Sequence, residues 1–346
     1  MKKIKIAQIG VGHDHACDTF RTICSMSDCF DVVGWCAAEG EEERAEQFKK
    51  QWPFLAEKPQ MTLEELLALP GLEAVTVETD DWLLTKYTHI AAHHGLHIHM
   101  DKPGGTASND PAEFEAMLRT VKHGGKVFQT GYMYRYNPYY LKVLEMVEQG
   151  ELGPIYSVET HMDCEHAPEK RDWLSHFRGG MMNFLGCHLV DLIFRLQGIP
   201  EEILPLNTSS GFDGVTANDI GFAVFRYPHG VSFAKTAACE PGGFMRRQLV
   251  VCGQKKTVSL LPFEAYAENG QTTSMRICDN GKGWGYAGEH STSEVVDRYQ
   301  GMMRDFHDMA CGMHENPYTL DYEARLHRIL LAACGETIDY KGDIVL

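Results

Sequence analysis

A histidine and an aspartate stand three residues apart in an otherwise apolar run, GGMMNFLGCHLVD, which begins at Gly179. On one continuous helix, His188 and Asp191 would share a stripe with Phe184 and Arg195. A histidine can move a proton near neutral pH, and a carboxylate can orient its ring. The same pattern also fits a core histidine beside an ion pair between Asp191 and Arg195. The spacing alone leaves both interpretations open.

A second group of polar side chains lies upstream, in THMDCEHAPEKRDW. His161, Asp163 and Glu165 alternate along an expected strand, so they would face one side of it. Imidazoles and carboxylates in that arrangement can ligate a metal. They can also form the wall of a sugar site, where aromatic rings pack on the sugar and charged groups bind its hydroxyls. We expect the wall without a bound metal, formed by Tyr136, Asp163, Glu165, Arg171 and Trp173.

A glycine turn follows the first expected strand, IKIAQIG. Gly10, Gly12 and Ala16 are spaced as GxGxxA, directly before an expected helix. In such a turn the first glycine permits the bend and the second lets a pyrophosphate approach the backbone. The small third residue lets the helix pack closely, with its N-terminus toward the phosphates. His13 lies within the turn and is a candidate phosphate contact, so the motif predicts a dinucleotide site.

Strand-like and helical runs alternate through residues 1–131, which indicates a doubly wound parallel sheet, or Rossmann domain. Ligands of such sheets bind outside the carboxyl ends of the strands. The strand-end residues that we expect at the cofactor are Thr79, Asp81, Asp101, Lys102 and Tyr132.

The choice between NAD and NADP depends on the end of the second strand. An acid near that position binds the ribose hydroxyls of NAD, and Glu39 is the acid nearest to the expected strand end at Ala37. Residues 39–43 carry four acids and no base, which would repel a 2′-phosphate. We therefore expect NAD rather than NADP, with Arg44 as the residue that could reverse this preference.

Residues 132–346 contain further strand-like runs separated by turn signals, including a hairpin candidate at Tyr227–Gly230. They indicate a second α/β domain with a large, mostly antiparallel sheet. Helices are expected at 139–149, 181–197, 295–311 and 322–339.

Composition limits the class of protein. The 346 residues exceed one usual core, so two domains are expected. A net charge of −16 disfavours nucleic acid or an anionic membrane as a partner and favours a small molecule. No apolar run approaches the roughly 20 residues of a membrane helix. Eleven cysteines without a CxxC pair or a signal-peptide start predict reduced thiols in the cytoplasm.

Four motifs occur in a characteristic order. They are the glycine turn, then GLHI followed by DKPGG at Asp101–Gly105, then GYMYRYNP at Gly131–Pro138, then GGMMNFLGCHLVD. Together they resemble the Gfo/Idh/MocA family of NAD(P)-dependent oxidoreductases across essentially the whole chain. The family patterns are G-K-H-V with E-K-P, G-x-x-x-R-F-x-P, and G-G-x-L-x-D-x-G-x-H-x-x-D. The family's catalytic acid, one turn before the histidine, corresponds to Phe184, which is a departure.

The resemblance implies a reaction and roles for its residues. Lys102 would hydrogen-bond the reacting hydroxyl, and Asp191 would orient His188. Because the usual acid is missing, either His188 takes the hydroxyl proton itself or another carboxylate, Asp163 or Glu165, replaces the acid. Hydride would pass between nicotinamide and a ring hydroxyl carbon of a sugar, glycoside or cyclitol. Two alternatives remain. One is an NAD-dependent glycosidase that uses transient oxidation and elimination without net redox change, and the other is a non-catalytic NAD-binding sensor. The implied assembly is a homodimer or homotetramer formed through the second domain's sheet.

Overall fold

The computed structural model describes residues 2–104 and 111–346, so Gly105 of the DKPGG motif lies outside the described residues. The chain divides into two compact units. The first runs to Met133 and also includes residues 299–327 and 343–346, whereas the second holds residues 134–298 and 328–342. This division differs from the predicted two continuous domains. The late segments join the first unit because Ala324, Leu320 and Leu346 pack in its hydrophobic core.

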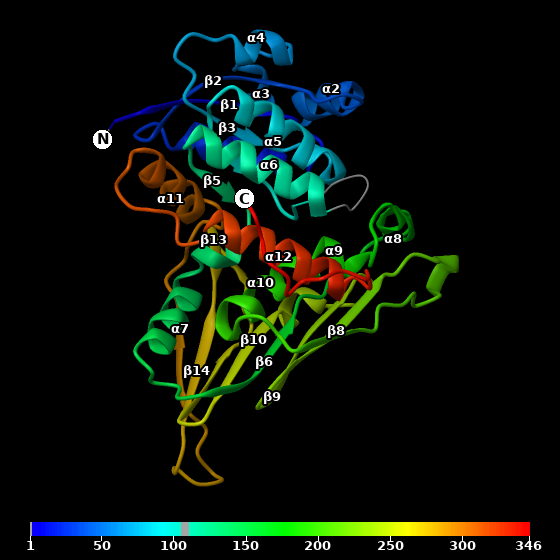
Figure 1. Ribbon diagram of the computed structural model, residues 1–346, viewed down its shortest axis with the longest axis vertical. Coiled ribbons are helices and arrows are strands. Elements are labelled where there is room, and N and C mark those ends of the chain that lie inside the picture. The colour runs from blue at the N-terminus through cyan, green and yellow to red at the C-terminus, as the bar shows by residue number, and fades with distance from the viewer. Residues whose placement is uncertain (1, 105–110) are drawn as a thin grey trace. The chain divides into compact units, whose positions relative to one another are not determined.

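The first unit is built on a five-stranded parallel sheet in the order β2-β1-β3-β4-β5, which confirms the predicted doubly wound sheet. Its strands are β1 (Ile4–Ile9), β2 (Phe30–Cys36), β3 (Ala74–Val77), β4 (His97–Met100) and β5 (Phe128–Thr130). Its helices are α1 (Ala16–Ser25), α2 (Glu42–Gln51), α3 (Pro53–Ala56), α4 (Leu63–Leu67), α5 (Leu84–His93), α6 (Pro111–Gly124) and α11 (Gln300–Ala310). The helix α5 packs on β3 and β4 and against α6. Figure 1 shows the two helices side by side.

The strand order reverses between β1 and β3, and ligands of such sheets bind in the crevice outside the strand ends at that point. Two glycines bring the turn after β1 against the end of β3. Gly10 has a φ of +89°, and a Cβ there would lie 2.7 Å from the backbone of Thr79. A Cβ on Gly12 would lie 2.4 Å from the backbone nitrogen of Asp80. Close backbone approach therefore requires glycine at both positions.

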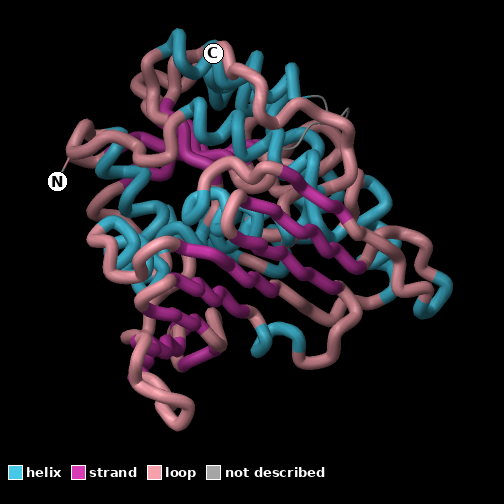
Figure 2. Tube along the Cα trace, turned by 60° about the horizontal axis from the view of Figure 1, so that its bottom comes forward, coloured by secondary structure: helices cyan, strands magenta, loops and turns pink. Residues whose placement is uncertain are grey.

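The second unit contains an eight-stranded sheet in the order β15-β14-β11-β10-β6-β9-β8-β7. Its strands are β6 (Ile155–His161), β7 (Glu202–Pro205), β8 (Ile220–Tyr227), β9 (Gly230–Ala237), β10 (Gln248–Gly253), β11 (Lys256–Leu260), β14 (Ser274–Asp279) and β15 (Glu289–Thr292). Neighbouring strands are antiparallel except for the parallel pair β6 and β9, as Figure 2 lets the reader follow. A separate hairpin joins β12 (Ala265–Ala267) to β13 (Gly270–Thr272). This arrangement confirms the predicted mostly antiparallel sheet, and the YPHG turn connects β8 to β9.

Alternating burial along the strands gives this sheet two different faces. In β8, for example, Gly221, Ala223 and Phe225 are buried while their neighbours are not. The helices of this unit are α7 (Pro138–Glu148), α8 (Pro168–Trp173), α9 (Met181–Phe184) and α10 (Gly186–Gln197). The last two pack on β8, β9 and β6. The helix α12 (Leu320–Ala333) runs from the first unit into the second.

The predicted single helix over 181–197 is interrupted. Leu185 has a φ of −108° and separates α9 from α10. The amide of His188 reaches only three residues back, to the carbonyl of Leu185, rather than four. Phe184 and His188 therefore do not lie one turn apart on a continuous α-helix, and the predicted stripe does not hold across Leu185.

Two composition-based expectations can be compared with the structure. All eleven cysteines are free, which agrees with the predicted absence of a disulfide framework. Within the described ranges, no helix is long and apolar enough to cross a membrane.

Candidate functional site

The glycine turn of the first unit is held by a buried carboxylate, Glu41. Its side chain is 2% exposed and accepts hydrogen bonds from the amides of Val11 (2.7 Å), Ala38 (2.9 Å) and Asp80 (3.0 Å). Burial raises the pKa of Glu41, while the three amide donors oppose that rise by stabilising the charged form. The carboxylate thus ties together the turn after β1, the segment after β2 and the segment after β3.

Glu39, the acid expected to bind ribose, lies differently. Its side chain is 79% exposed and pairs with Lys86 at 3.0 Å. Arg44 lies near two carboxylates of the turn region, at 3.6 Å from Asp14 and 3.8 Å from Asp80. The acid that contacts the glycine turn is therefore Glu41, two residues beyond the one that sequence spacing selected.

His13 is fully buried at the carboxyl edge of the sheet, among carboxylates. Its Nδ1 lies 3.2 Å from Asp101 Oδ2, and its Nε2 lies 3.0 Å from the backbone oxygen of Lys102 and 3.5 Å from Asp81 Oδ1. The structure thus brings together four of the predicted cofactor residues, His13, Asp81, Asp101 and Lys102. Thr79 and Tyr132 are also buried at strand ends in this unit.

The charges in this cluster shift one another's pKa values. Burial would lower the pKa of His13, but the charges of Asp101 and Asp81 outweigh it and raise that pKa well above its usual value. Burial opposes ionisation of Asp101 too, yet His13 and His15 hold its pKa well below the usual range. Glu78, also fully buried, has its pKa raised by burial and by the charge of Asp101. Strong mutual perturbation of this kind is typical of functional sites.

Lys102 follows Asp101 at the end of β4 and is 1% exposed. Its amide donates a 2.7 Å hydrogen bond to Asp101 Oδ1. A buried lysine is uncommon in proteins, because its ammonium group loses hydration. Its burial next to the glycine turn sets Lys102 apart from the surface lysines of this chain.

In the second unit, His188 lies near the start of α10 and is 1% exposed. Its ring packs against Tyr134, with 5.2 Å between the ring centroids. The hydroxyl of Tyr134 donates a 2.6 Å hydrogen bond to Glu264, whose carboxylate also pairs with Arg247 and Arg298. Burial opposes ionisation of Glu264, but Arg298 and Arg247 lower its pKa. The histidine is thus packed on an aromatic ring that a charged network holds in place.

Asp191 forms a bidentate ion pair with Arg135, a residue of the GYMYRYNP motif. The Arg135 Nε and Nη2 atoms lie 2.9 Å and 2.8 Å from the two carboxylate oxygens, and both side chains are 1% exposed. The spacing suggested an i+4 pair with Arg195, and it gave no indication of this bidentate pair with Arg135. This ion pair joins the start of the second unit to α10.

Phe184, which stands where the family has its acid, lies in an aromatic cluster. Its ring is edge-on to Trp173 at 5.3 Å and stacked with Phe177 at 6.3 Å. The Nζ atom of Lys170 lies 3.5 Å from the centroid of the Trp173 ring and 5.0 Å from that of Phe184. The surroundings of Phe184 are thus aromatic rings with one cation. Such surroundings can pack against the C–H face of a sugar, and they would hold a free carboxylate less well.

The remaining residues of the predicted wall separate into two places. Glu165 and Arg171 line one cavity of about 350 Å³, together with His166 and Asp213. Arg171 is itself ion-paired with Asp213 and with Asp219. Tyr136, the other aromatic residue of the wall, lies half-buried just before α7.

Asp163 lies at the other place, just beyond the end of β6. It is fully buried, and its Oδ1 lies 2.9 Å from Lys235 Nζ. His161 lies 3.8 Å from the same carboxylate, and Glu165 is exposed. The cation of Lys235 accounts for the charge of Asp163, so these three residues do not converge on one point as metal ligands would.

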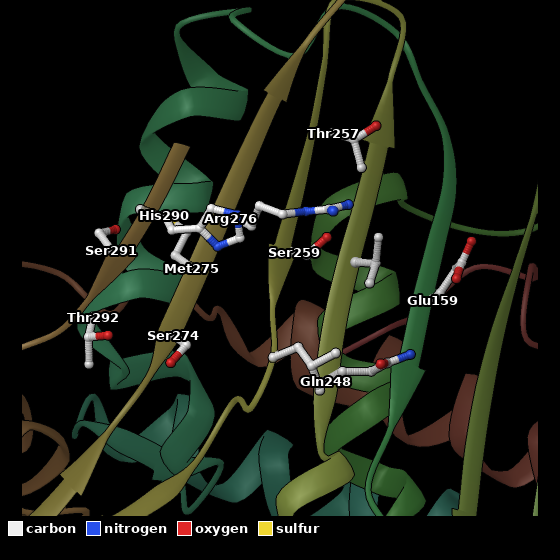
Figure 3. A pocket seen from close by; sticks show the side chains of 12 residues that line it. Glu159, Gln248, Thr257, Ser259, Ser274, Met275, Arg276, His290, Ser291 and Thr292 are labelled. Carbon is white, nitrogen blue, oxygen red and sulfur yellow. The ribbon is translucent and has the colours of Figure 1, made fainter. Parts of the chain in front are cut away.

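A separate groove of about 820 Å³ lies on the eight-stranded sheet, away from these residues. Side chains of β6, β10, β11, β14 and β15 line it, as Figure 3 shows. Its lining is largely polar: Glu159, Gln248, Thr257, Ser259, Ser274, Arg276, His290, Ser291 and Thr292.

Sequence reasoning missed three contributors to these sites. Glu41 was one of four acids in a short run, and nothing in the sequence distinguished it from its neighbours. Arg135 carried a signal, because it is the arginine of a recognised motif. Glu78 stands directly after the apolar strand β3, where a buried acid is unusual, and that position was a usable signal.

Comparison with known proteins shows what the chain is similar to. Residues 140–259 match the GFO/IDH/MocA C-terminal domain. D-xylose 1-dehydrogenase (NADP(+)) 2 of Haloferax volcanii is 28% identical over 172 residues, which cover 49% of this chain and 51% of that protein. The scyllo-inositol 2-dehydrogenase (NAD(+)) of Bacillus subtilis is 30% identical over 159 residues, which cover 45% and 43%. The chain thus matches about half the length of these curated relatives.

The fold is shared over nearly the full chain with a solved structure. The aldose-aldose oxidoreductase of Caulobacter crescentus superimposes with a TM-score of 0.77 at 20% sequence identity. The superposition covers 96% of each chain. The fold predicted from the motifs is therefore confirmed.

Proposed function

We propose that this chain, whose residues 140–259 match the GFO/IDH/MocA C-terminal domain, is an NAD-dependent oxidoreductase of that family acting on a ring hydroxyl of a sugar, glycoside or cyclitol. The observation that carries the proposal is the buried Lys102 beside the glycine turn, at the edge of the sheet where such folds bind ligands. The names of the relatives, a xylose dehydrogenase and an inositol dehydrogenase, support a polyhydroxy substrate.

The residues at the glycine turn fit a dinucleotide. Gly10 and Gly12 leave no room for a Cβ beside Thr79 and Asp80, so the turn packs closely against the end of β3. In a glycine turn of this spacing, a pyrophosphate can approach the backbone. Bound NAD supplies the hydride acceptor. On this proposal Glu41 accepts hydrogen bonds from the ribose hydroxyls, and its charge disfavours a 2′-phosphate. Arg44 does not cancel this preference, because its charge is already near Asp14 and Asp80.

Two side chains handle the substrate hydroxyl on this proposal. Lys102 holds the hydroxyl oxygen and His188 accepts its proton, since the family's acid is replaced by Phe184. Trp173 and Phe184 pack against the C–H face of the substrate ring, with Lys170 beside them. Asp191 positions α10 through Arg135 and does not take the proton.

The test is NADH formation at 340 nm with a panel of sugars, glycosides and cyclitols. With an identified substrate, Lys102→Ala and His188→Ala are each expected to lower kcat/KM by about 10²- to 10⁴-fold, the usual contribution of a positioned acid or base. Lys86→Ala, at a half-exposed lysine of the same unit, is the control and should leave turnover unchanged. Wild-type turnover by Lys102→Ala would refute the proposed chemistry.

The ribose contact is tested by a matched pair of variants, Glu41→Gln and Glu39→Gln. A charged hydrogen bond contributes about 1.5–3 kcal/mol, so Glu41→Gln should weaken NAD binding by roughly tenfold or more and improve NADP relative to NAD. Glu39→Gln should change neither affinity. The reverse result would return the ribose role to Glu39.

A glycosidase is the second candidate, and Phe184 favours it. Because an apolar cluster replaces the usual acid, the chain is a candidate for a different reaction. In that reaction NAD takes a hydride from the substrate and later returns it, so that no net redox change results. Cleavage of an aryl glycoside without net NADH formation would support this candidate over the dehydrogenase. Tight NAD binding with neither activity would support a sensor.

We also propose that the chain forms a homodimer or homotetramer through the grooved face of its eight-stranded sheet. Val250 lines that groove, so Val250→Arg should convert the assembly to monomers in light scattering. Lys3→Glu, at an exposed residue of the other unit, is the control. A monomeric wild-type protein, or an unchanged mass for Val250→Arg, would reject this interface.

A further inference from the structure

The backbone of Lys102 is held by side chains on both sides of its Cα. Its amide donates a 2.7 Å hydrogen bond to Asp101 Oδ1, and its carbonyl oxygen lies 3.0 Å from His13 Nε2. Because a carbonyl oxygen only accepts, the imidazole of His13 is the donor of the second bond. Side chains from the glycine turn after β1 and from the end of β4 thus hold the backbone of one residue.

His13 is itself fixed by contacts of its backbone and its ring. Its amide donates a 3.0 Å hydrogen bond to the carbonyl of Glu78, just after β3. Its Nδ1 accepts a 3.1 Å hydrogen bond from the His15 amide, so the neutral ring carries its hydrogen on Nε2, which faces Lys102. The charged ring also carries a hydrogen on Nε2, so the bond to Lys102 forms in both protonation states. Asp81 Oδ1 lies farther from the same nitrogen, at 3.5 Å.

Burial distinguishes two roles for His13. Its place in the glycine turn made it a candidate phosphate contact, but its side chain is 0% exposed and both ring nitrogens already have partners in the first unit. A contact with phosphate would require the ring to leave the carbonyl of Lys102. The geometry therefore favours a histidine that holds the protein over one that faces a ligand.

The position of the Lys102 backbone matters because the lysine side chain is a long, flexible stem. A catalytic side chain has to be held to within about 0.5 Å by the residues around it, and fixing its backbone is the first requirement. The next residue, Pro103, has no amide hydrogen, so the backbone after Lys102 cannot be anchored through a following N–H. The Lys102 carbonyl, bonded to His13, supplies an anchor at this place.

We propose that His13 is a positioning residue for Lys102, which it ties to the glycine turn through the Lys102 carbonyl. This inference rests on the proposed function, in which Lys102 holds the oxygen of the reacting hydroxyl. Because the glycine turn is also where a dinucleotide pyrophosphate approaches the backbone, His13 connects the backbone that binds the cofactor to the residue that contacts the substrate. Asp101 completes the arrangement through the Lys102 amide.

Two polar variants of the full chain that differ by one methylene group test this bond. In His13→Gln the side-chain amide takes the place of Nε2 and can donate to the Lys102 carbonyl, whereas in His13→Asn it reaches only the place of Nδ1. With an identified substrate, His13→Asn should lower kcat/KM by about 10²-fold, mainly through kcat, which is the effect that a misplacement of 1 Å can have. His13→Gln should recover most of that loss. The dissociation constant of NAD should be equal in the two variants.

A second readout needs no substrate. The rate at which acetic anhydride acetylates Lys102, followed by mass spectrometry, reports how often this buried side chain becomes accessible to solvent. Loss of one buried hydrogen bond should raise that rate about three- to tenfold in His13→Asn and leave it unchanged in His13→Gln. Acetylation of the half-exposed Lys86 in the same samples is the control, and circular dichroism verifies that each variant folds.

Equal kcat/KM values for the two variants, or equal acetylation rates of Lys102, would overturn the inference. A loss of NAD affinity in His13→Asn with kcat unchanged would overturn it too, because His13 would then act on the cofactor. If acetylation separates the variants while Lys102→Ala keeps wild-type turnover, the hold of His13 on Lys102 is supported and the proposed chemistry fails. The two failures are therefore distinguishable.

Discussion

The ion pair between Arg135 and Asp191 allows a stability prediction whose size follows from its geometry. Both side chains are 1% exposed and share two charge-assisted hydrogen bonds, of 2.8 Å and 2.9 Å. Each such bond contributes about 1.5–3 kcal/mol. Removing one partner also takes both of these bonds from the buried charge that remains, which brings the expected cost to about 3–5 kcal/mol. Arg135→Met and Asp191→Leu should each destabilise the second unit by that amount.

The double variant Arg135→Met/Asp191→Leu separates the energy of the ion pair from the cost of burying a charge that has lost this partner. Because it removes both charges and replaces them with apolar groups, it should cost clearly less than the two single variants together, with a coupling energy of at least about 2 kcal/mol. Urea unfolding followed by circular dichroism measures these differences as midpoint shifts at constant m. Arg226→Met removes an exposed ion pair with Glu201 and Glu202, and should cost no more than about 1 kcal/mol.

Two results would refute the reasoning about this pair. One is a single variant that costs less than about 1 kcal/mol, which would mean that the buried charge left behind finds another partner. The other is additivity of the two single changes within about 0.5 kcal/mol, which would mean that the two groups act independently.

The remaining predictions concern His97 and Gly180. Burial lowers the pKa of His97 to about 4, and its Nδ1 accepts a hydrogen bond from the Val127 amide, so the folded chain resists protonation that the unfolded chain undergoes below about pH 6.5. The contribution of His97 to the free energy of unfolding is therefore complete above pH 6.5 and is lost as pH falls toward 4, by about 1–2 kcal/mol after solvent screening. The variant His97→Gln should make the urea midpoint less dependent on pH in this range. An unchanged pH dependence would contradict the prediction. Gly180→Ala should destabilise by about 2–3 kcal/mol in the same assay, because φ is +50° and the new Cβ would lie 2.2 Å from the Asn218 oxygen. Gly211→Ala, in the left-handed region with φ of +71° and open space around it, should cost only about 1 kcal/mol, and equal losses would show that the contact with Asn218 is unimportant.

The two sheets were predictable because the burial of a strand determines how its apolar residues repeat along the sequence. The strand β3 is buried throughout and β1 is buried at every position except Lys5, as expected for a parallel sheet. The strand β8 alternates, as expected for a strand with one open face. The glycine turn was predictable because only glycine permits the close approach to Thr79 and Asp80.

The partners of the polar residues were less predictable, because they depend on contacts between distant segments. Asp191 had a plausible partner four residues away in Arg195, and nothing in the spacing indicated the bidentate pair with Arg135, 56 positions away. The break at Leu185 was hidden because the apolar pattern continues across it, although the backbone does not. Glu41 rather than Glu39 faces the glycine turn because the chain bends at Gly40, whose φ is +85°.

The return of residues 299–327 and 343–346 to the first unit has a consequence for synthesis on the ribosome. The parallel sheet emerges early, but Ala324, Leu320, Ile344 and Leu346, which pack in its core, emerge only near the end. Part of the apolar surface of the nascent first unit therefore stays exposed while nearly the whole second unit is synthesised. The order of folding is thus expected to run against the order of synthesis, with the N-terminal half completing its core last.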